Sequence, residues 1–329
     1  MKLPELKIGN LKASLPIVQG GMGVRISLAS LASAVANEGG IGLIAASGVH
    51  PQELAEHIRE AKKLTDGIIG INVMVAIREF KELVMTAVRE RVDVIVAGAG
   101  FSRDIFIIGN EYNIPIVPIV SSEKAARISE KFGAAAIIVE GKEAGGHLGT
   151  DKPLFSILPG IIKAVKIPVI AAGGILKGSD IAKVFSMGGK GVQMGTRFAA
   201  SEESSAAPAW KEAYVNAKSE DVVLIKSPVG LPGRALNTSF VKDLLANKIP
   251  AHTDIKRCVK CLKHCKKDFC IIEALENAQE GNMKKGLVFC GERVGEINNI
   301  LSVKEIIKNL IEEFKESIFG GKSECKKEL

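Results

Sequence analysis

The chain has 329 residues, of which 47% are hydrophobic, 5% aromatic and 25% charged, and its formal net charge is +7. This length allows one large α/β unit or two domains, with a core built mainly from aliphatic side chains. No apolar run approaches the roughly 18 residues that cross a bilayer, and the first residues lack the apolar core of a signal peptide. We therefore expect a cytoplasmic protein, and the modest charge predicts neither a nucleic-acid nor a membrane partner.

Eight short apolar runs lie between residues 16 and 198, and most of them are followed by a helix-like stretch. The runs are 16–22, 41–46, 69–75, 92–98, 115–120, 134–141, 168–174 and 191–198. Eight βα units whose strands are apolar on both faces predict an α/β fold, the (β/α)₈ TIM barrel. A doubly wound open sheet is the alternative, although it more often has about five or six strands.

The alternation of apolar runs and helix-like stretches stops after Phe198. Residues 201–290 contain a turn-rich stretch, SPVGLPGR, and a cluster of cysteines, and we expect them to form a smaller, mainly helical segment over the barrel mouth. Apolar residues at helical spacing in 302–314 predict a helix that returns to the barrel wall. The predicted division is therefore a barrel of residues 1–200 and 291–318, a substrate or lid segment of 201–290, and a flexible tail, 319–329.

A glycine-rich loop with one histidine, EGKEAGGHLG at residues 140–149, follows the sixth apolar run. Parallel sheets keep their chemistry at the carboxyl ends of the strands. An imidazole there can exchange a proton with a substrate near neutral pH, so His147 is the candidate catalytic residue. Glu140 or Glu143 could orient the ring. The alternative is a turning loop whose histidine has no chemical role.

Glycines also end the seventh and eighth runs, where barrels of this kind often bind phosphate. Gly173 and Gly174 end the seventh run, and Gly195 precedes Thr196 at the end of the eighth. Glycine lets backbone N–H groups approach an anion, and a threonine adds a hydroxyl donor. These loops therefore predict a phosphate site. Tight packing between strand and helix would favour glycine too, and is the alternative.

The first strand ends in Gly20, Gly21 and Met22. A flat aromatic ring can lie against backbone where side chains are absent, so this is a candidate ring site. Asn72 on the third strand and Gln193 on the eighth are amides in apolar runs. Each is either a hydrogen-bonded core amide or a group that bonds the polar edge of a heterocycle.

Five motifs occur in the order VQGGM, GINVM, EGKEAGGHLG, PVIAAGGI and VQMGTRF. Together they resemble the nitronate monooxygenase (2-nitropropane dioxygenase) family, which includes FMN-dependent enoyl-acyl-carrier-protein reductases. The resemblance covers roughly residues 10–240 and implies FMN in a TIM barrel with His147 facing the flavin. The residues implied to bind FMN are Gly20, Gly21, Met22, Asn72, Glu140, Gly145, Gly146, Gly173, Gly174, Gln193, Gly195 and Thr196.

The resemblance implies an FMN-dependent oxidoreductase, with the oxidation of alkyl nitronates by O₂ as the first expectation. His147 would act on a substrate stacked on FMN. The alternatives are an enoyl-acyl-carrier-protein reductase or a quinone reductase, both of which take electrons from NAD(P)H. The expected partner is thus a small molecule (a nitronate, an enoyl thioester or a quinone), and a homodimer is one expected assembly. A flavin or metal redox sensor is the non-enzymatic alternative.

Four of the six cysteines fall within 13 residues, at Cys258, Cys261, Cys265 and Cys270. The reducing compartment expected of a cytoplasmic protein argues against disulfides, and four close thiols suit an iron–sulfur cluster or zinc. The spacing matches neither a zinc ribbon nor the standard ferredoxin pattern, so free or transiently oxidised thiols remain the third interpretation. Lysines and Arg257 surround the cluster; they are Lys256, Lys260, Lys263, Lys266 and Lys267. They would lower the pKa of a thiolate or meet an acidic partner.

Overall fold

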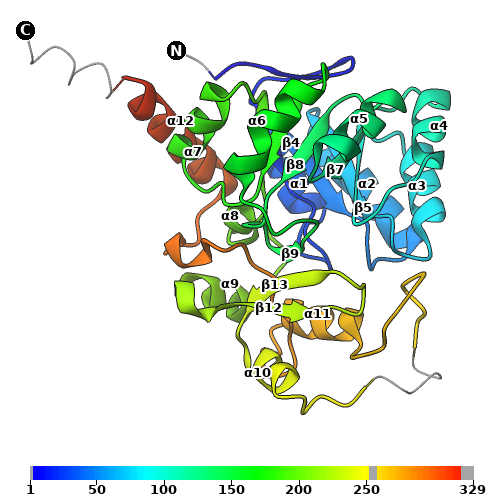
Figure 1. Cartoon of the computed structure of the whole chain (residues 1–329), viewed down its shortest axis with the longest axis vertical. Coiled ribbons are helices and arrows are strands. Elements are labelled where there is room, and N and C mark those ends of the chain that lie inside the picture. Colours follow the sequence, from blue (N-terminus) through cyan, green and yellow to red (C-terminus); the bar gives the residue numbers. More distant parts are fainter. Residues whose placement is uncertain (1–2, 252–257, 320–329) are drawn as a thin grey trace, which may run out of the picture.

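The computed structural model describes residues 3–251 and 258–319. Lys256 and Arg257 lie outside these ranges, and so does the predicted tail apart from Phe319. The described chain forms a barrel ringed by helices, with a smaller appended segment against one end (Figure 1). Among the described helices, none is long and apolar enough to span a membrane.

Eight parallel strands close the barrel in the order β10-β11-β3-β4-β5-β6-β7-β8. Their bounds are β3 Ile17–Gln19, β4 Ile41–Ala45, β5 Ile68–Met74, β6 Val94–Gly98, β7 Ile116–Val120, β8 Ile137–Glu140, β10 Val169–Ala172 and β11 Gly191–Met194. Each strand overlaps one of the predicted apolar runs, which confirms the TIM barrel.

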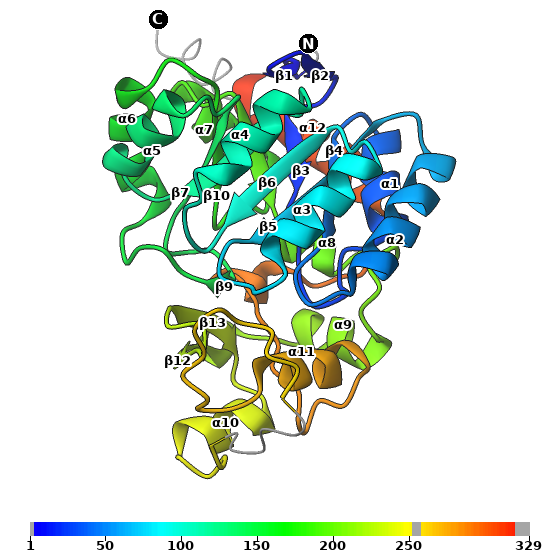
Figure 2. The same ribbon diagram turned by 90° about the vertical axis from the view of Figure 1, so that its right-hand side faces the viewer.

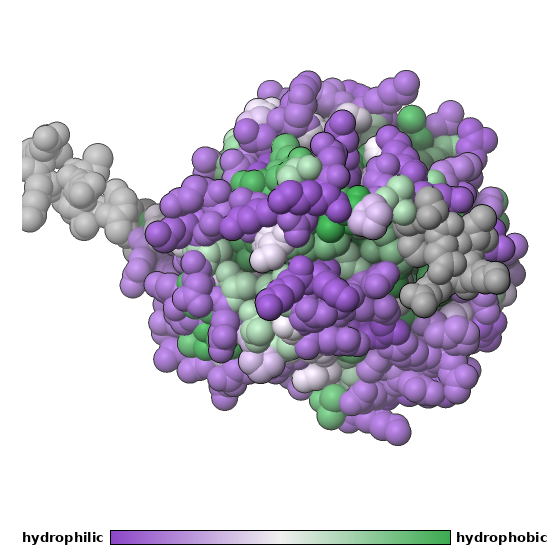
Figure 3. Space-filling model, turned by 90° about the horizontal axis from the view of Figure 1, so that it is seen from below, coloured by the Kyte–Doolittle hydropathy of each residue, from purple (hydrophilic) through white to green (hydrophobic). Residues whose placement is uncertain are grey.

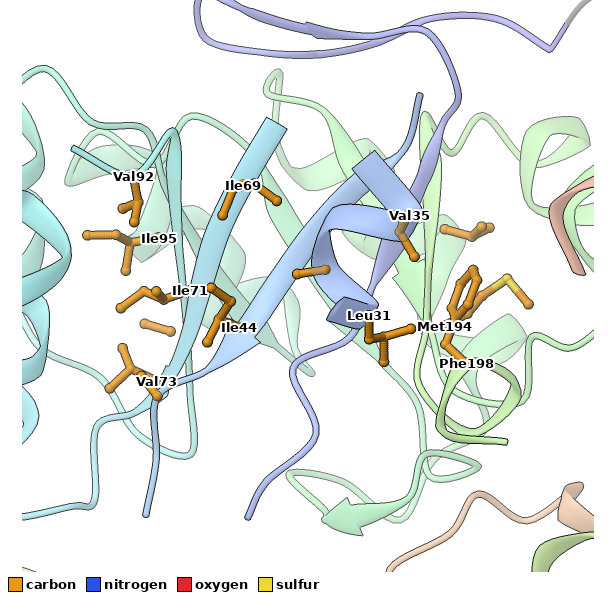
Figure 4. Packing of buried hydrophobic residues seen from close by; sticks show 14 of the residues in the cluster. Leu31, Val35, Ile44, Ile69, Ile71, Val73, Val92, Ile95, Met194 and Phe198 are labelled. Atoms are coloured by element: carbon orange, nitrogen blue, oxygen red, sulfur yellow. The ribbon is translucent and has the colours of Figure 1, made fainter. Parts of the chain in front are cut away.

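The strands are apolar on both faces because each face is buried against a different partner. Ile44, Ile71 and Ile95 pack outward against the helices (Figure 4), in one large cluster. Leu43 and Val96 belong to a separate cluster that fills the barrel. Burial on both faces produces the continuous apolar runs that distinguish parallel strands from the alternating pattern of one-sided sheets.

A short hairpin precedes the barrel and was not predicted. Its strands, β1 (Leu6–Ile8) and β2 (Leu11–Ala13), pair antiparallel. Leu6 and Ile8 are buried and belong to the cluster inside the barrel. The hairpin lies at the end of the barrel away from the appended segment (Figure 2), so it plugs the amino-terminal end of the strands.

Seven helices alternate with the strands and an eighth returns from the end of the chain. They are α1 Ala29–Asn37, α2 Pro51–Leu64, α3 Phe80–Arg89, α4 Asp104–Glu111, α5 Glu123–Lys131, α6 Leu154–Ala164, α7 Gly178–Ser186 and α12 Val303–Phe319. At the contact between α7 and α12, a Cβ on Gly178 would lie 2.2 Å from the backbone nitrogen of Phe314. The helix predicted to return to the barrel wall is therefore present, and a glycine allows its close approach.

The appended segment contains both helices and strands. Its elements are α8 Thr196–Ala199 at its start, then α9 Pro208–Val215, η1 Ser219–Asp221, β12 Val222–Lys226, β13 Pro232–Leu236, α10 Ser239–Leu245 and α11 Ile271–Gln279, and η2 Val294–Glu296 follows on the way to α12. The two strands form a three-stranded antiparallel sheet with β9 (Gly146–His147), a two-residue strand from the loop after β8. The sheet was not predicted, and it joins the appended segment to the barrel at the candidate catalytic residue.

Candidate active site

A cavity of about 290 Å³ lies where the carboxyl ends of the barrel strands meet the appended segment. Its wall includes His147 and every residue that the motifs implied for cofactor binding, from Gly20 on the first strand to Thr196 after the last. The closed barrel brings together residues that are far apart in sequence, because all parallel strands end on the same face. The structure thus assembles the predicted set, while the role of each residue stays a prediction.

The cavity floor is formed where β3, β5 and β11 end. A Cβ on Gly21 would lie 2.2 Å from the Cβ of Asn72, so only glycine leaves this surface flat. The side chain of Gln193 lines the cavity, and its Oε1 is buried without a hydrogen-bond partner in the described residues. A buried acceptor without a donor is costly, and a ligand N–H or O–H in the cavity would satisfy it.

Loops from three parts of the chain meet at one end of the cavity. Gly173 and Gly174 have positive φ angles of 100° and 70°, which glycine adopts without strain. Gly291 donates its backbone N–H to Thr196 Oγ1 over 3.0 Å. Arg293 donates to the carbonyl of Gly174 and forms an ion pair with Asp180 at 2.9 Å. Backbone donors, a hydroxyl and a guanidinium therefore gather where the phosphate was predicted.

His147 is held between the barrel and the appended sheet. Its backbone pairs with Gly233 of β13, and its ring packs edge-on against Phe289 with centroids 5.1 Å apart. Its Nε2 lies 2.8 Å from Ser227 Oγ, in the loop between β12 and β13. Neither Glu140 nor Glu143 orients the ring: the Oε2 of Glu143 accepts a hydrogen bond from Leu154 N at 2.9 Å.

Burial shifts the pKa values of two cavity residues, His147 and Glu140, in opposite directions. It lowers the pKa of His147 to about 4 and raises the pKa of Glu140 to about 8, because an apolar environment disfavours the charged form of each. At pH 7 both side chains are therefore neutral. Neither His147 nor Glu140 therefore carries a charge beside the ring position.

The wall of the cavity away from the barrel floor is apolar. Residues of α11 and of the chain around it contribute Leu262, Ile271, Ile272, Leu275 and Phe289. From the outside, the face formed by the appended segment is mostly hydrophilic, with less polar residues across its middle (Figure 3). The cavity can thus hold a flat polar ligand on its floor and an apolar ligand above it.

These features fit the FMN that the motifs imply. The glycine floor at Gly20 and Gly21 leaves room for a planar ring, and Gln193 has an unpaired acceptor for its polar edge. The loops at Gly173, Gly174 and Thr196 offer donors to a phosphate. Bound there, FMN would place its ring beside His147.

Of the four clustered cysteines, Cys261 lines the cavity. All four are free thiols, and burial together with the neighbouring thiols raises the pKa of Cys261 to about 11. Within residues 3–251 and 258–319, no three histidine, cysteine or acidic side chains form a group that could hold a metal. The structure therefore gives no support to iron–sulfur or zinc binding, which stays a prediction.

Several residues of the site were not predicted from the sequence. Ser227 contacts His147, and the cavity lining includes Phe289, Cys290, Gly291, Arg293 and Val294. Ser227 lies in the turn-rich SPVGLPGR stretch, and Cys290 and Gly291 are consecutive in sequence. The turn-rich stretch and the Cys-Gly pair indicate turns but no particular chemistry. Only the fold shows that these residues reach the site.

Comparison with known proteins relates most of this chain to one family. The family model described as nitronate monooxygenase matches residues 5–84 and 75–313. A probable nitronate monooxygenase of Staphylococcus aureus is 30% identical, over 71% of this chain and 78% of the relative.

Two other proteins are also similar to this chain. A (3aS,4S,5R,7aS)-5-hydroxy-7a-methyl-1-oxo-octahydro-1H-indene-4-carboxyl-CoA dehydrogenase of Mycobacterium tuberculosis is 35% identical, over 70% of this chain; the match spans 65% of that relative, a little under two thirds of its length. The structure of FabK from Thermotoga maritima superposes with a TM-score of 0.85 at 33% identity and covers 94% of this chain and 96% of that one. The FabK match therefore includes most of the appended segment.

Proposed function

This chain belongs to the nitronate monooxygenase family, as its motifs predict, and from this premise we propose that it is an FMN-dependent oxidoreductase that reduces an unsaturated acyl thioester. The overall reaction would convert an enoyl thioester, NAD(P)H and a proton into the saturated thioester and NAD(P)⁺. FMN, when bound, supplies the hydride chemistry. The residues of this chain bind and orient the reactants and keep water away from them.

The observation that carries this proposal is the apolar wall that faces the barrel floor. Leu262, Ile272 and Leu275 line the cavity on the side of the appended segment, and this apolar lining suits an acyl chain better than a small nitronate. The neutral state of His147 also favours a neutral substrate, since no imidazolium is available to balance the charge of a nitronate. The FabK superposition over most of the chain and the relative named as a carboxyl-CoA dehydrogenase support the same substrate class.

Nitronate oxidation, the first expectation from the motifs, is the second candidate. A neutral imidazole can serve as a base toward a nitroalkane carbon, and the Staphylococcus aureus relative supports this activity. The two candidates differ in what reduces the flavin: NAD(P)H for the reductase, the nitronate itself for the monooxygenase.

Anaerobic titration of the purified, flavin-loaded protein distinguishes them. We expect NADH or NADPH to bleach the visible flavin absorbance and crotonyl-CoA to restore it, with the saturated thioester as product. If propyl nitronate bleaches the flavin while neither nicotinamide does, the reductase proposal is wrong and the monooxygenase takes its place.

Replacement of His147 by alanine tests the catalytic role. We expect turnover to fall at least about 100-fold, because a positioned polar group at the reacting centre contributes roughly this much, while bound flavin stays at the wild-type level. The control is His57→Ala on α2, a histidine outside the cavity wall. Unchanged turnover in His147→Ala would contradict the assignment.

A further inference from the structure

The contact between His147 and Ser227 links the cavity to the appended sheet. Ser227 lies between β12 and β13, is 2% exposed, and its Oγ is 2.8 Å from His147 Nε2. The surrounding turn is held by its own backbone, since Gly230 N donates to Ser227 O over 2.9 Å. The hydroxyl is therefore placed by a closed turn and not by a mobile side chain on the surface.

The direction of this hydrogen bond follows from the other partner of the hydroxyl. Val229 donates its backbone N–H to Ser227 Oγ over 3.3 Å, so the oxygen is already an acceptor. Among the described residues, His147 Nε2 is the remaining partner of this buried hydroxyl. A buried O–H proton without an acceptor is costly, so the hydroxyl donates to Nε2.

This direction determines the tautomer of the ring. A neutral imidazole has one protonated and one unprotonated nitrogen. Since Nε2 accepts from Ser227, the proton of the neutral ring is on Nδ1. Burial keeps the ring neutral, as it lowers the pKa of His147 to about 4.

We infer that Ser227 is a positioning residue that holds His147 as the Nδ1–H tautomer, so that the histidine presents a hydrogen-bond donor to the substrate. This inference rests on the proposed function for the identity of the acceptor, which is the carbonyl oxygen of the thioester. A donor at that oxygen stabilises the negative charge that develops there when hydride reaches the β carbon. A carbon acid, which needs an imidazole lone pair, fits this arrangement less well.

NMR of the flavin-loaded protein labelled with ¹⁵N-histidine tests the tautomer directly. We expect long-range H–N correlations of His147, identified by their loss in His147→Ala, to show protonated Nδ1 and unprotonated Nε2 at pH 7. A protonated Nε2 would overturn the inference. This measurement does not depend on turnover, so a correct tautomer without thioester reduction would contradict only the proposed function.

Substitution of Ser227 tests whether its hydroxyl determines the tautomer of His147. In Ser227→Ala we expect the Nδ1–H tautomer to give way to a mixture, and kcat to fall roughly three- to tenfold with a smaller change in KM, as expected for the loss of one hydrogen bond. Ser227→Thr keeps the hydroxyl and restores the tautomer. The control is Ser129→Ala, a serine that is 0% exposed and lies outside the cavity wall. An unchanged tautomer in Ser227→Ala would overturn the inference.

Discussion

The barrel and the appended segment contribute to the same cavity in different ways. The barrel side is backbone and small groups: glycines at Gly21 and Gly173, with the amides of Asn72 and Gln193. The appended side is mainly apolar, and the Ser227 hydroxyl of the same segment contacts His147. The floor thus suits a flat ligand such as a cofactor. The wall above it is made of side chains, which suits contact with a substrate.

This contrast suggests a division of labour. The barrel would bind the cofactor, and the appended segment would select the substrate and hold the catalytic histidine. If so, substitutions in the barrel floor change flavin content, and substitutions in the appended segment change turnover without changing flavin content.

The largest effect on flavin binding is expected for Gly21→Ala in the barrel floor. The added Cβ would lie 2.2 Å from the Cβ of Asn72, so Asn72 or the backbone at position 21 has to shift and the floor changes shape. Overpacking of this kind costs about 1–3 kcal/mol, which corresponds to flavin binding weakened roughly fivefold to a hundredfold. Bound flavin after purification and a fluorescence titration of FMN measure the change.

Gly149→Ala is the matched control, because the nearest atom to its Cβ would be the tip of the Ser121 side chain at 3.0 Å, which can turn away. Full flavin binding by Gly21→Ala would show that the floor is not the ring site. Loss of flavin in both variants would show that the effect is not specific to the floor.

The barrel could be predicted from the sequence because its signals are local. Each strand is apolar on both faces and has its own helix, so runs such as 41–46 and 92–98 indicate β4 and β6 without knowledge of the neighbours. The cavity glycines could be predicted for the same reason, since they follow the ends of those runs. The hairpin β1–β2 was missed, because strands of three residues carry too little pattern to distinguish from a loop.

The appended segment could not be predicted because its structure depends on long-range pairing. The strand β9 has two residues and exists only because β13, more than 80 residues later, pairs with it. Ser227 carries no signal of its own chemistry; its importance comes from its distance to His147. Contacts of this kind are set by the tertiary fold and leave no periodicity in the sequence.

The next effect is expected in the pH dependence of the free energy of unfolding, and it arises from Glu140 at the barrel side of the cavity. Burial raises the pKa of Glu140 to about 8 from an ordinary value of 4.5. Between these values the unfolded chain is ionised and the folded carboxyl is not. The contribution of Glu140 to the free energy of unfolding is therefore most favourable below about pH 4.5. It decreases by about 1.4 kcal/mol per pH unit up to pH 8.

Glu140→Gln removes the titrating group, so we expect the free energy of unfolding of the flavin-free variant to fall less between pH 6 and 8 than that of the wild type. Urea unfolding at several pH values measures the slope. The control is Glu111→Gln, an exposed position on α4, for which the wild-type slope should remain. An equal slope in Glu140→Gln would mean that the folded carboxyl is ionised and that the cavity is less apolar than its lining indicates.

The smallest effect is expected at an ion-pair bridge between the two regions. Arg25 lies in the loop after β3 and contacts Glu53 of α2 at 2.7 Å and Glu276 of α11 at 2.6 Å. The side chains of Arg25 and Glu276 are 30% and 37% exposed, so solvent and salt weaken the bridge, which contributes at most about 1 kcal/mol.

Glu276→Gln removes the charge on the appended side and leaves the pair of Arg25 with Glu53 intact. Since α11 also supplies Ile272 and Leu275 to the apolar wall, we expect KM for the acyl substrate to rise about two- to threefold, an effect that disappears at high salt. Glu273→Gln, an exposed residue on the same helix, is the control and should leave KM unchanged. Bound flavin should stay constant in both variants, because the barrel floor does not depend on this bridge. A fall in flavin content in Glu276→Gln would show that the appended segment helps to hold the cofactor, and the proposed division of labour between the two regions would then be wrong.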